Sequence, residues 1–93
     1  EEGWLPLIDN LCSHLQFNTD NNNRAGRYPQ VEAVQVKEKF GGLRFYVDEA
    51  TDVQYAVISF VESLSIKTCE VCGAPGKQRG GGWIKTLCDE HAK

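Results

Sequence analysis

The sequence has no methionine, no long apolar run and no strong excess of charge of either sign. Spanning a bilayer takes about 18 consecutive apolar residues, and no basic segment followed by an apolar one opens the chain, so neither a membrane span nor a secretion leader is predicted. The protein is therefore expected in the cytoplasm. Because methionine is absent and the chain begins "EEGW", the sequence is expected to be a processed or trimmed form of a longer product.

The size and charge of the chain limit its fold and its partners. Its 93 residues carry a formal net charge of -3, and 41% of them are hydrophobic, which is typical of a soluble globular chain. A chain of this length buries only somewhat more than about 60% of its unfolded surface, so a single domain over residues 1–93 is predicted, and it would gain from a staple. The charge provides no overall field that attracts nucleic acid or an anionic membrane, so a basic protein surface is the easier partner.

Two helices are predicted before the cysteine-rich tail. Apolar residues recur at helical spacing from Trp4 to Phe17, with Pro6 where a first turn tolerates it. Residues 18–30 are rich in asparagine and are expected to form a long polar loop. Thr51 followed by Gln54 predicts a capping box at the start of a second helix. The apolar face of that helix is expected to consist of Val53, Val57, Phe60, Val61 and Leu64.

An antiparallel β-hairpin is predicted between the helices, because two alternating runs flank Gly41-Gly42. With both glycines in the turn, Phe40 lies opposite Leu43 and Val36 opposite Val47. One face then carries Val34, Val36, Phe40, Leu43, Phe45 and Val47. The other face carries Gln35, Lys37, Lys39, Arg44, Tyr46 and Asp48. Among these, the possible partner-binding residues are Lys37, Lys39, Arg44 and Tyr46. They could contact a phosphate chain or an acidic partner, although the solvated face of a sheet usually has this composition.

The tail contains Cys69-x2-Cys72 and Cys88-x2-His91, separated by fifteen residues. This spacing is typical of a tetrahedral Cys3His zinc site, and four protein ligands leave no open position, so a structural zinc is predicted. Disulfides are an alternative, but three clustered cysteines and the distant Cys12 do not pair evenly, and a cytosolic chain keeps them reduced. Iron is a further alternative.

The glycines of the tail predict its local structure. Gly73 would relieve crowding in a zinc knuckle, and the glycines at 80–82 mark the turn of a short hairpin whose return strand covers 83–87. The Cys88-x2-His91 spacing suits the first turn of a helix. A knuckle, a hairpin and a helical turn make a treble clef, whereas a zinc ribbon has two knuckles and no helix; both remain open.

Other candidate sites have simpler interpretations. Cys12 and His14 are two apart on a helix and point to different sides, so they do not form a nucleophile and base, and Cys12 is expected in the core. His14 is also the sole candidate for the extra histidine of a nuclease-type treble clef. The segment "GAPGKQ" lacks the spacing of a phosphate-binding loop.

Basic residues around Trp83 raise the possibility of nucleic-acid binding. Lys77, Arg79 and Lys85 could hold a phosphate backbone while Trp83 stacks on a base. The favoured interpretation is that Trp83 packs beneath the zinc knuckle as part of a small core. The reason is that nearby acidic residues cancel the local positive charge: Glu70, Asp89 and Glu90.

The segments "GWLPLIDNLC", "QVKEKFGGLRFYV", "CEVCGAPG" and "GWIKTLCDEH" resemble a family of small uncharacterised bacterial and phage proteins with a C-terminal CxxC...CxxH zinc-binding motif. The resemblance covers nearly the whole chain. It implies zinc at the four tail residues already named and an origin in a mobile element or accessory gene. It implies no reaction and no substrate.

Together these features predict an α+β protein with a helix, a hairpin and a helix in residues 1–67, and a zinc module of treble-clef or zinc-ribbon type in residues 68–93. The expected function is non-enzymatic: binding to a protein partner, with a phage or accessory inhibitor or neutralising factor as one form of that role. The alternative is a nucleic-acid-binding zinc module. No membrane partner is expected.

Overall fold

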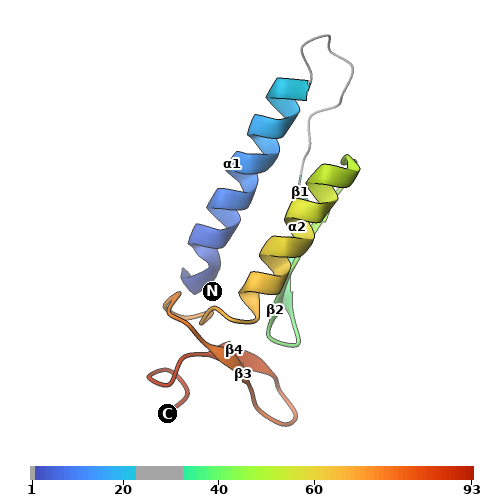
Figure 1. Ribbon diagram of the computed structural model, residues 1–93. Coiled ribbons are helices and arrows are strands. Elements are labelled where there is room, and N and C mark those ends of the chain that lie inside the picture. Colours follow the sequence, from blue (N-terminus) through green and yellow to red (C-terminus); the bar gives the residue numbers. More distant parts are fainter. Residues whose placement is uncertain (1, 23–32) are drawn as a thin grey trace.

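The computed structural model describes residues 2–22 and 33–93 (Figure 1). A short 3-10 helix, η1 (Glu2–Trp4), leads into α1 (Leu5–Asn22). The remaining elements are β1 (Ala33–Lys39), β2 (Gly42–Val47), α2 (Asp52–Ser65), β3 (Lys77–Arg79) and β4 (Lys85–Leu87). The predicted α+β order of helix, hairpin, helix and C-terminal strand pair is confirmed. Within the described ranges, no helix combines the length and apolarity needed to cross a membrane.

The ends of both helices test the sequence predictions. Helix α1 continues to Asn22, so the predicted polar loop was wrong for residues 18–22; the rest of that loop lies outside the described residues. Asparagine and aspartate lower helix propensity by less than about 1 kcal/mol each, which is too little to end a helix already under way. The capping box of α2 is confirmed: the Thr51 hydroxyl accepts from the Gln54 N–H at 3.2 Å, and the Gln54 side chain accepts from the Thr51 N–H at 2.8 Å.

The hairpin forms with a different register from the one predicted. Lys39 lies opposite Gly42 and Val36 opposite Phe45, so the turn residues are Phe40 and Gly41, with φ of 54° and 79°. Two positive φ values are typical of the tight turn that matches strand twist. Gly42 serves a different purpose, because a Cβ there would lie 3.2 Å from the Ile66 side chain. The shift moves pairings by two positions, so the paired residues keep their predicted faces.

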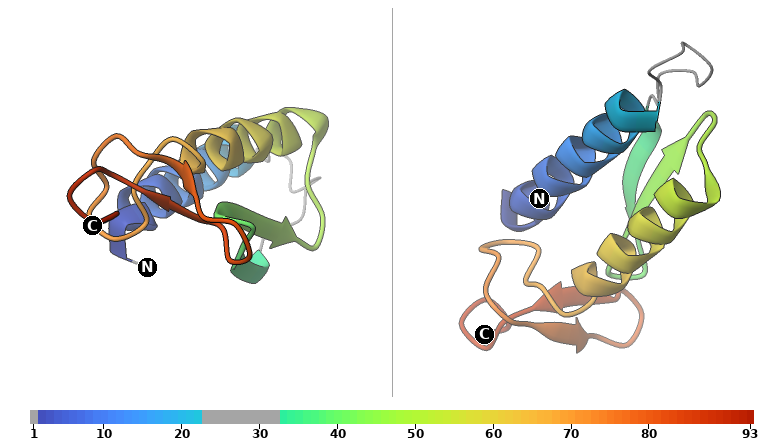
Figure 2. Two further views of the ribbon diagram at one scale, coloured as in Figure 1. Left: turned by 90° about the horizontal axis from the view of Figure 1, so that it is seen from below. Right: turned by 45° about the horizontal axis from the view of Figure 1, so that its top comes forward.

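The core lies between the two helices and β2. Figure 2 shows the hairpin against one side of the helix pair. The buried cluster consists of Trp4, Leu11, Leu15, Leu43, Phe45, Ile58 and Val61. Strand β1 contributes none of these residues and is exposed along its length. The predicted apolar face of the hairpin was therefore wrong for Val34, Val36 and Phe40, which are exposed.

The rotation of α2 also differs from prediction. Ile58 and Val61 face the core, whereas Val53 and Phe60 are 61% and 63% exposed. Side-chain hydrogen bonds to the free edge of β2 explain the rotation. The Leu43 N–H donates to the Ser65 hydroxyl and the Phe45 N–H donates to the Glu62 carboxylate, each at 2.8 Å. Backbone donors on buried residues need partners, and the observed rotation of α2 supplies both.

The C-terminal module packs directly on the body. The Trp4 indole N–H donates to the Thr68 carbonyl and the Gly3 N–H to the Glu70 carbonyl, both at 2.9 Å. At the hairpin turn, the fully buried Thr86 hydroxyl donates to the Gly41 carbonyl at 2.6 Å. The first residues of the chain and the β1–β2 turn thus hold the module at two separate places (Figure 1).

Candidate metal centre

The first ligand pair lies in the turn that follows α2. The Gly73 N–H donates to the Cys69 carbonyl at 2.9 Å, and the Cys69 N–H donates to the Ala74 carbonyl at 2.7 Å. Gly73 has a φ of 84°, a conformation that favours glycine. This closed turn directs the side chains of Cys69 and Cys72 to the same point.

The second pair lies directly after β4. The antiparallel pairing of β3 and β4, with Lys77 opposite Leu87, returns the chain to the first pair. The Ala92 N–H then donates to the Cys88 carbonyl at 3.0 Å, closing one helix-like turn that contains His91. In the described chain, residues 89–92 form this turn rather than a regular helix, an arrangement compatible with both predicted module types.

The four side chains form one cluster with the geometry of a metal site. One ligand atom from each of Cys69, Cys72, Cys88 and His91 lies within 4.8 Å of all the others. The Cys72 and Cys88 sulfurs are 3.7 Å apart, and the His91 Nδ1 lies 3.2 Å from the Cys88 sulfur and 3.8 Å from the Cys69 sulfur. Tetrahedral zinc with ordinary bond lengths requires about 3.8 Å between sulfurs and about 3.6 Å between sulfur and nitrogen.

The cysteines are free thiols rather than disulfides. A disulfide would bring two sulfurs to about 2.05 Å, far closer than the Cys72 and Cys88 sulfurs are. The Cys3His cluster can therefore hold a metal ion. Four protein donors fill a tetrahedral shell, so the donor set provides no position for an activated water.

Electrostatics favour thiolates at two of the corners. Burial raises the pKa of the Cys69 thiol, but hydrogen bonds from backbone N–H groups, that of Cys88 first, outweigh it and lower this pKa to about 6. The backbone N–H and the imidazole of His91 lower the pKa of Cys88, and the same imidazole contact raises the pKa of His91. Thiolate is the form that binds metals, so the lowered pKa values of Cys69 and Cys88 would favour metal binding at these two residues.

A buried polar pair supports the knuckle from behind. Glu70 follows the first ligand and is almost fully buried, as is Thr86 on β4. The Glu70 N–H donates to the Thr86 carbonyl at 3.0 Å, and the Thr86 N–H donates back to the Glu70 carboxylate at 3.2 Å. The sequence analysis treated Glu70 as a surface charge. A glutamate beside a cysteine ligand gives no sequence pattern from which its burial could be read.

The predicted partner-binding residues share one face of the hairpin. Lys37 and Arg44 lie opposite each other, and the Lys37 ammonium lies 5.7 Å from the centre of the Tyr46 ring. Lys37, Lys39 and Tyr46 are exposed, while Arg44 is half-buried and donates to the Leu43 carbonyl at 3.3 Å. The face exists as predicted, on the β1–β2 hairpin and not within the metal cluster.

Three other predicted placements can be compared with the structure. Cys12 is exposed, so its assignment to the core was wrong; partial burial and the Asp9 charge raise its pKa. His14 lines a groove between α1 and α2 and is not a member of the metal cluster. Trp83 is 75% exposed and does not pack beneath the knuckle, which corrects the favoured interpretation of that residue. The β3–β4 hairpin is too short to enclose a large ring at its tip.

Comparison of this chain with protein-family models, with curated proteins and with solved structures gives no match in any of the three. The fold and the cluster define the class: a small α+β protein with a C-terminal Cys3His cluster that can hold a metal ion. Function is inferred below from the chemistry of the cluster and from the surface around it.

Proposed function

We propose that the Cys3His cluster holds a structural zinc ion, which stabilises a non-enzymatic protein that works by binding a protein partner in the cytoplasm. The observation that carries the metal assignment is the close approach of all four ligand atoms, within 4.8 Å of one another. Three soft thiolates with one imidazole at tetrahedral separations suit zinc better than the oxygen-preferring ions. When bound, the ion would cross-link the turn that contains Cys69 and Cys72 to the turn that contains Cys88 and His91.

Elemental analysis of the purified protein tests the metal assignment. Protein prepared without chelator should contain one zinc per chain. The reason is that the four side chains form one closed site, and each binds zinc in its deprotonated form. Absorption above 300 nm provides the check for iron, since thiolate-bound iron is coloured and zinc is not. Iron in the site, or metal-free protein with an oxidised cysteine pair, would contradict the proposal.

A binding role is supported by the surface of the protein. Several large apolar side chains are exposed, and Val53 and Phe60 line a groove of about 580 Å³ between the two helices. Exposed apolar surface of this kind is common at protein interfaces. The net charge of -3 favours a partner with a basic surface. The family resemblance supports an accessory role in a bacterium or phage, such as inhibiting or neutralising a host protein.

Nucleic-acid binding is the second candidate, because Lys37, Lys39 and Tyr46 form an exposed face with Arg44. Changing the two exposed lysines, Lys37 and Lys39, together to glutamate should leave zinc content and folding near normal, since exposed substitutions usually stay within about 0.5 kcal/mol each. Capture of a protein partner docked elsewhere should survive. Nucleic-acid binding is measured by fluorescence anisotropy with labelled single-stranded and duplex DNA at several salt concentrations.

The unmodified protein is expected to show no DNA binding at physiological salt. A matched control changes two other exposed lysines to glutamate and so alters net charge equally: Lys67 and Lys93. Sub-micromolar, salt-sensitive binding that the hairpin variant loses and the control variant retains would reverse the ranking of the two candidate functions.

A further inference from the structure

An exposed tryptophan at the tip of the β3–β4 hairpin has no structural role in the core. Trp83 is 75% exposed, although the indole is among the side chains most favoured by burial. The loop that carries it is nonetheless constrained. Gly80 has a φ of 108°, and a Cβ there would overlap the Trp83 carbonyl oxygen. The tight return from Gly80 to Trp83 thus presents the indole to solvent.

A second exposed aromatic ring lies near it. Phe40, in the β1–β2 turn, is 64% exposed and has a φ of 54°. A positive φ is unusual and strained for a bulky residue, and asparagine or glycine would suit this turn position better. Strain of this kind is concentrated at functional sites. The backbone here is also held in place, because the Gln78 side chain donates to the Phe40 carbonyl at 2.9 Å.

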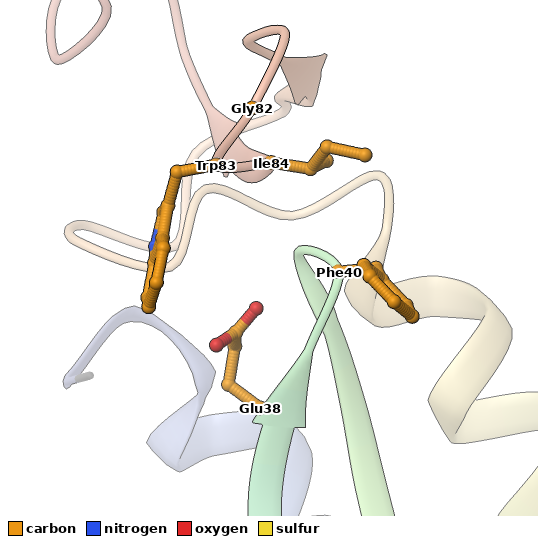
Figure 3. A pocket seen from close by; sticks show the side chains of 5 residues that line it. All are labelled: Glu38, Phe40, Gly82, Trp83 and Ile84. Carbon is orange, nitrogen blue, oxygen red and sulfur yellow. The ribbon is translucent and has the colours of Figure 1, made fainter.

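Together with Glu38 these rings line a pocket of about 250 Å³, here called the Trp83 pocket (Glu38, Phe40, Gly82, Trp83 and Ile84). Figure 3 shows the Trp83 indole and the Glu38 carboxylate on one side of the β1–β2 turn, and the Phe40 ring pointing away from them on the other side. Glu38 is the one charged residue among these five described lining residues. The pocket therefore combines the surface of the indole with a single negative charge.

The Glu38 carboxylate is oriented by one hydrogen bond and can accept further hydrogen bonds. One Glu38 oxygen accepts from the Gly41 N–H at 2.6 Å, which orients the group. A carboxylate has about four acceptor positions, so this bond leaves capacity for a ligand. The turn also provides an example of the interaction that we infer: the Lys39 ammonium lies 5.8 Å from the centre of the Phe40 ring.

We propose that the Trp83 pocket binds a lysine or arginine side chain of the protein partner. A cation gains from the face of an indole, the aromatic ring that binds cations best, and from the carboxylate, while the indole also accepts the aliphatic part of the side chain. The base of a nucleotide could stack on the indole, but its phosphate would meet the Glu38 charge. This inference rests on the proposed function, because it specifies the chemistry of the protein partner.

The indole N–H resonance of Trp83 in a ¹H–¹⁵N NMR spectrum tests the pocket directly on the zinc-loaded full chain. The probes are the blocked amino-acid amides N-acetyl-lysine amide and N-acetyl-arginine amide, with N-acetyl-norleucine amide as the uncharged match for lysine. Saturable shifts of the Trp83 resonance are expected with the two cations, with dissociation constants of about 1–10 mM because each is a single side chain. The buried Trp4 resonance should not move.

Two variants separate the contributions of the ring and of the charge. Trp83→Ala, followed through backbone resonances of the turn, should weaken binding of the cations at least about fivefold. Glu38→Gln keeps an oxygen for Gly41 but removes the charge, and it should weaken binding at least about threefold. The matched controls are Tyr55→Ala, another exposed aromatic residue, and Glu49→Gln, another exposed carboxylate. Neither control should change the affinity.

Adenosine monophosphate distinguishes a cation pocket from a nucleotide pocket, because Glu38→Gln should weaken the binding of a cation but strengthen the binding of a nucleotide. If the nucleotide binds more tightly than both cations, and if Glu38→Gln strengthens its binding, the proposal is wrong and the pocket accepts bases. Equal shifts with norleucine and lysine amides would also overturn it. Zinc content measured on the same samples distinguishes failure of this proposal from failure of the proposed function. If the chain contains zinc and captures a protein partner, but the Trp83 resonance does not shift with either cation, only the Trp83 pocket proposal is wrong.

Discussion

Cys72→Ser should abolish zinc binding and destabilise the whole chain, whereas Cys12→Ser should do neither. Both changes replace one sulfur atom by oxygen, and both side chains are exposed in the protein. A serine hydroxyl stays protonated near neutral pH and does not replace a thiolate ligand. Zinc sites in small domains contribute about 10–16 kcal/mol of apparent binding free energy, so losing one ligand should cost at least about 3 kcal/mol of unfolding free energy.

The effect should extend beyond the metal module. Loss of the knuckle frees the carbonyl groups of Thr68 and Glu70, which accept from the Trp4 indole and the Gly3 N–H. In a domain of this size each kcal/mol lowers the melting temperature by about 4–8 °C, so a fall of at least about 12 °C is expected. Thermal unfolding followed by circular dichroism and elemental analysis provides the measurement. Equal zinc content and melting temperature in the Cys72 and Cys12 variants would show that the cysteine ligands are wrongly assigned.

Gly3→Ala should be the most damaging change of a single glycine to alanine outside the turns. A Cβ at Gly3 would overlap the Cys69 carbonyl oxygen and lie 2.6–2.7 Å from backbone atoms of Glu70 and Gly73. Backbone atoms of a closed knuckle cannot move aside as a flexible side chain can. Overpacking of this kind typically costs about 1–3 kcal/mol, and the hydrogen bond from the Gly3 N–H to Glu70 is lost in addition.

Gly81→Ala is the matched control, because a Cβ at Gly81 meets nothing within 4 Å. Urea unfolding of the two variants should show a loss of about 2–4 kcal/mol for Gly3→Ala and no more than about 0.5 kcal/mol for Gly81→Ala. Zinc affinity should also fall in the Gly3 variant, measured by competition with a chromophoric chelator. Normal stability and affinity in that variant would mean that the N-terminal residues do not pack on the knuckle in solution.

The parts of the fold that the sequence could predict are those determined by short-range chemistry. The spacing of Cys69, Cys72, Cys88 and His91 predicted the cluster, because two short turns can each aim two ligands at one point. The capping box at Thr51 was equally local, since both hydrogen bonds join residues three apart. In both cases the structure depends mainly on contacts between residues that are close together in the sequence.

Long-range contacts decided the features that were predicted wrongly. The two adjacent glycines suggested a Gly41-Gly42 turn, but Gly42 is glycine because Ile66 packs against it, which no local pattern reveals. Helix α2 is apolar over a wide arc, and its rotation is selected by hydrogen bonds from β2 to Glu62 and Ser65. Trp83 was assigned to a core because acidic residues nearby in the sequence argued against nucleic-acid binding. It is instead exposed and lines a pocket with residues of another hairpin, which no local pattern reveals.

The hydrogen bonds from β2 to α2 also determine which edge of the β1–β2 sheet is open to a further strand. An unpaired strand edge is a template for a strand from another chain. On β2 that edge is closed, because Ser65 and Glu62 occupy the donors that an incoming strand would need. Strand β1, at the other edge of this sheet, contains Lys37 and Lys39. Lysines in an edge strand discourage the addition of a further strand. Helix α2 thus takes the place of a third strand at the β2 edge, because its side chains accept the hydrogen bonds that such a strand would accept.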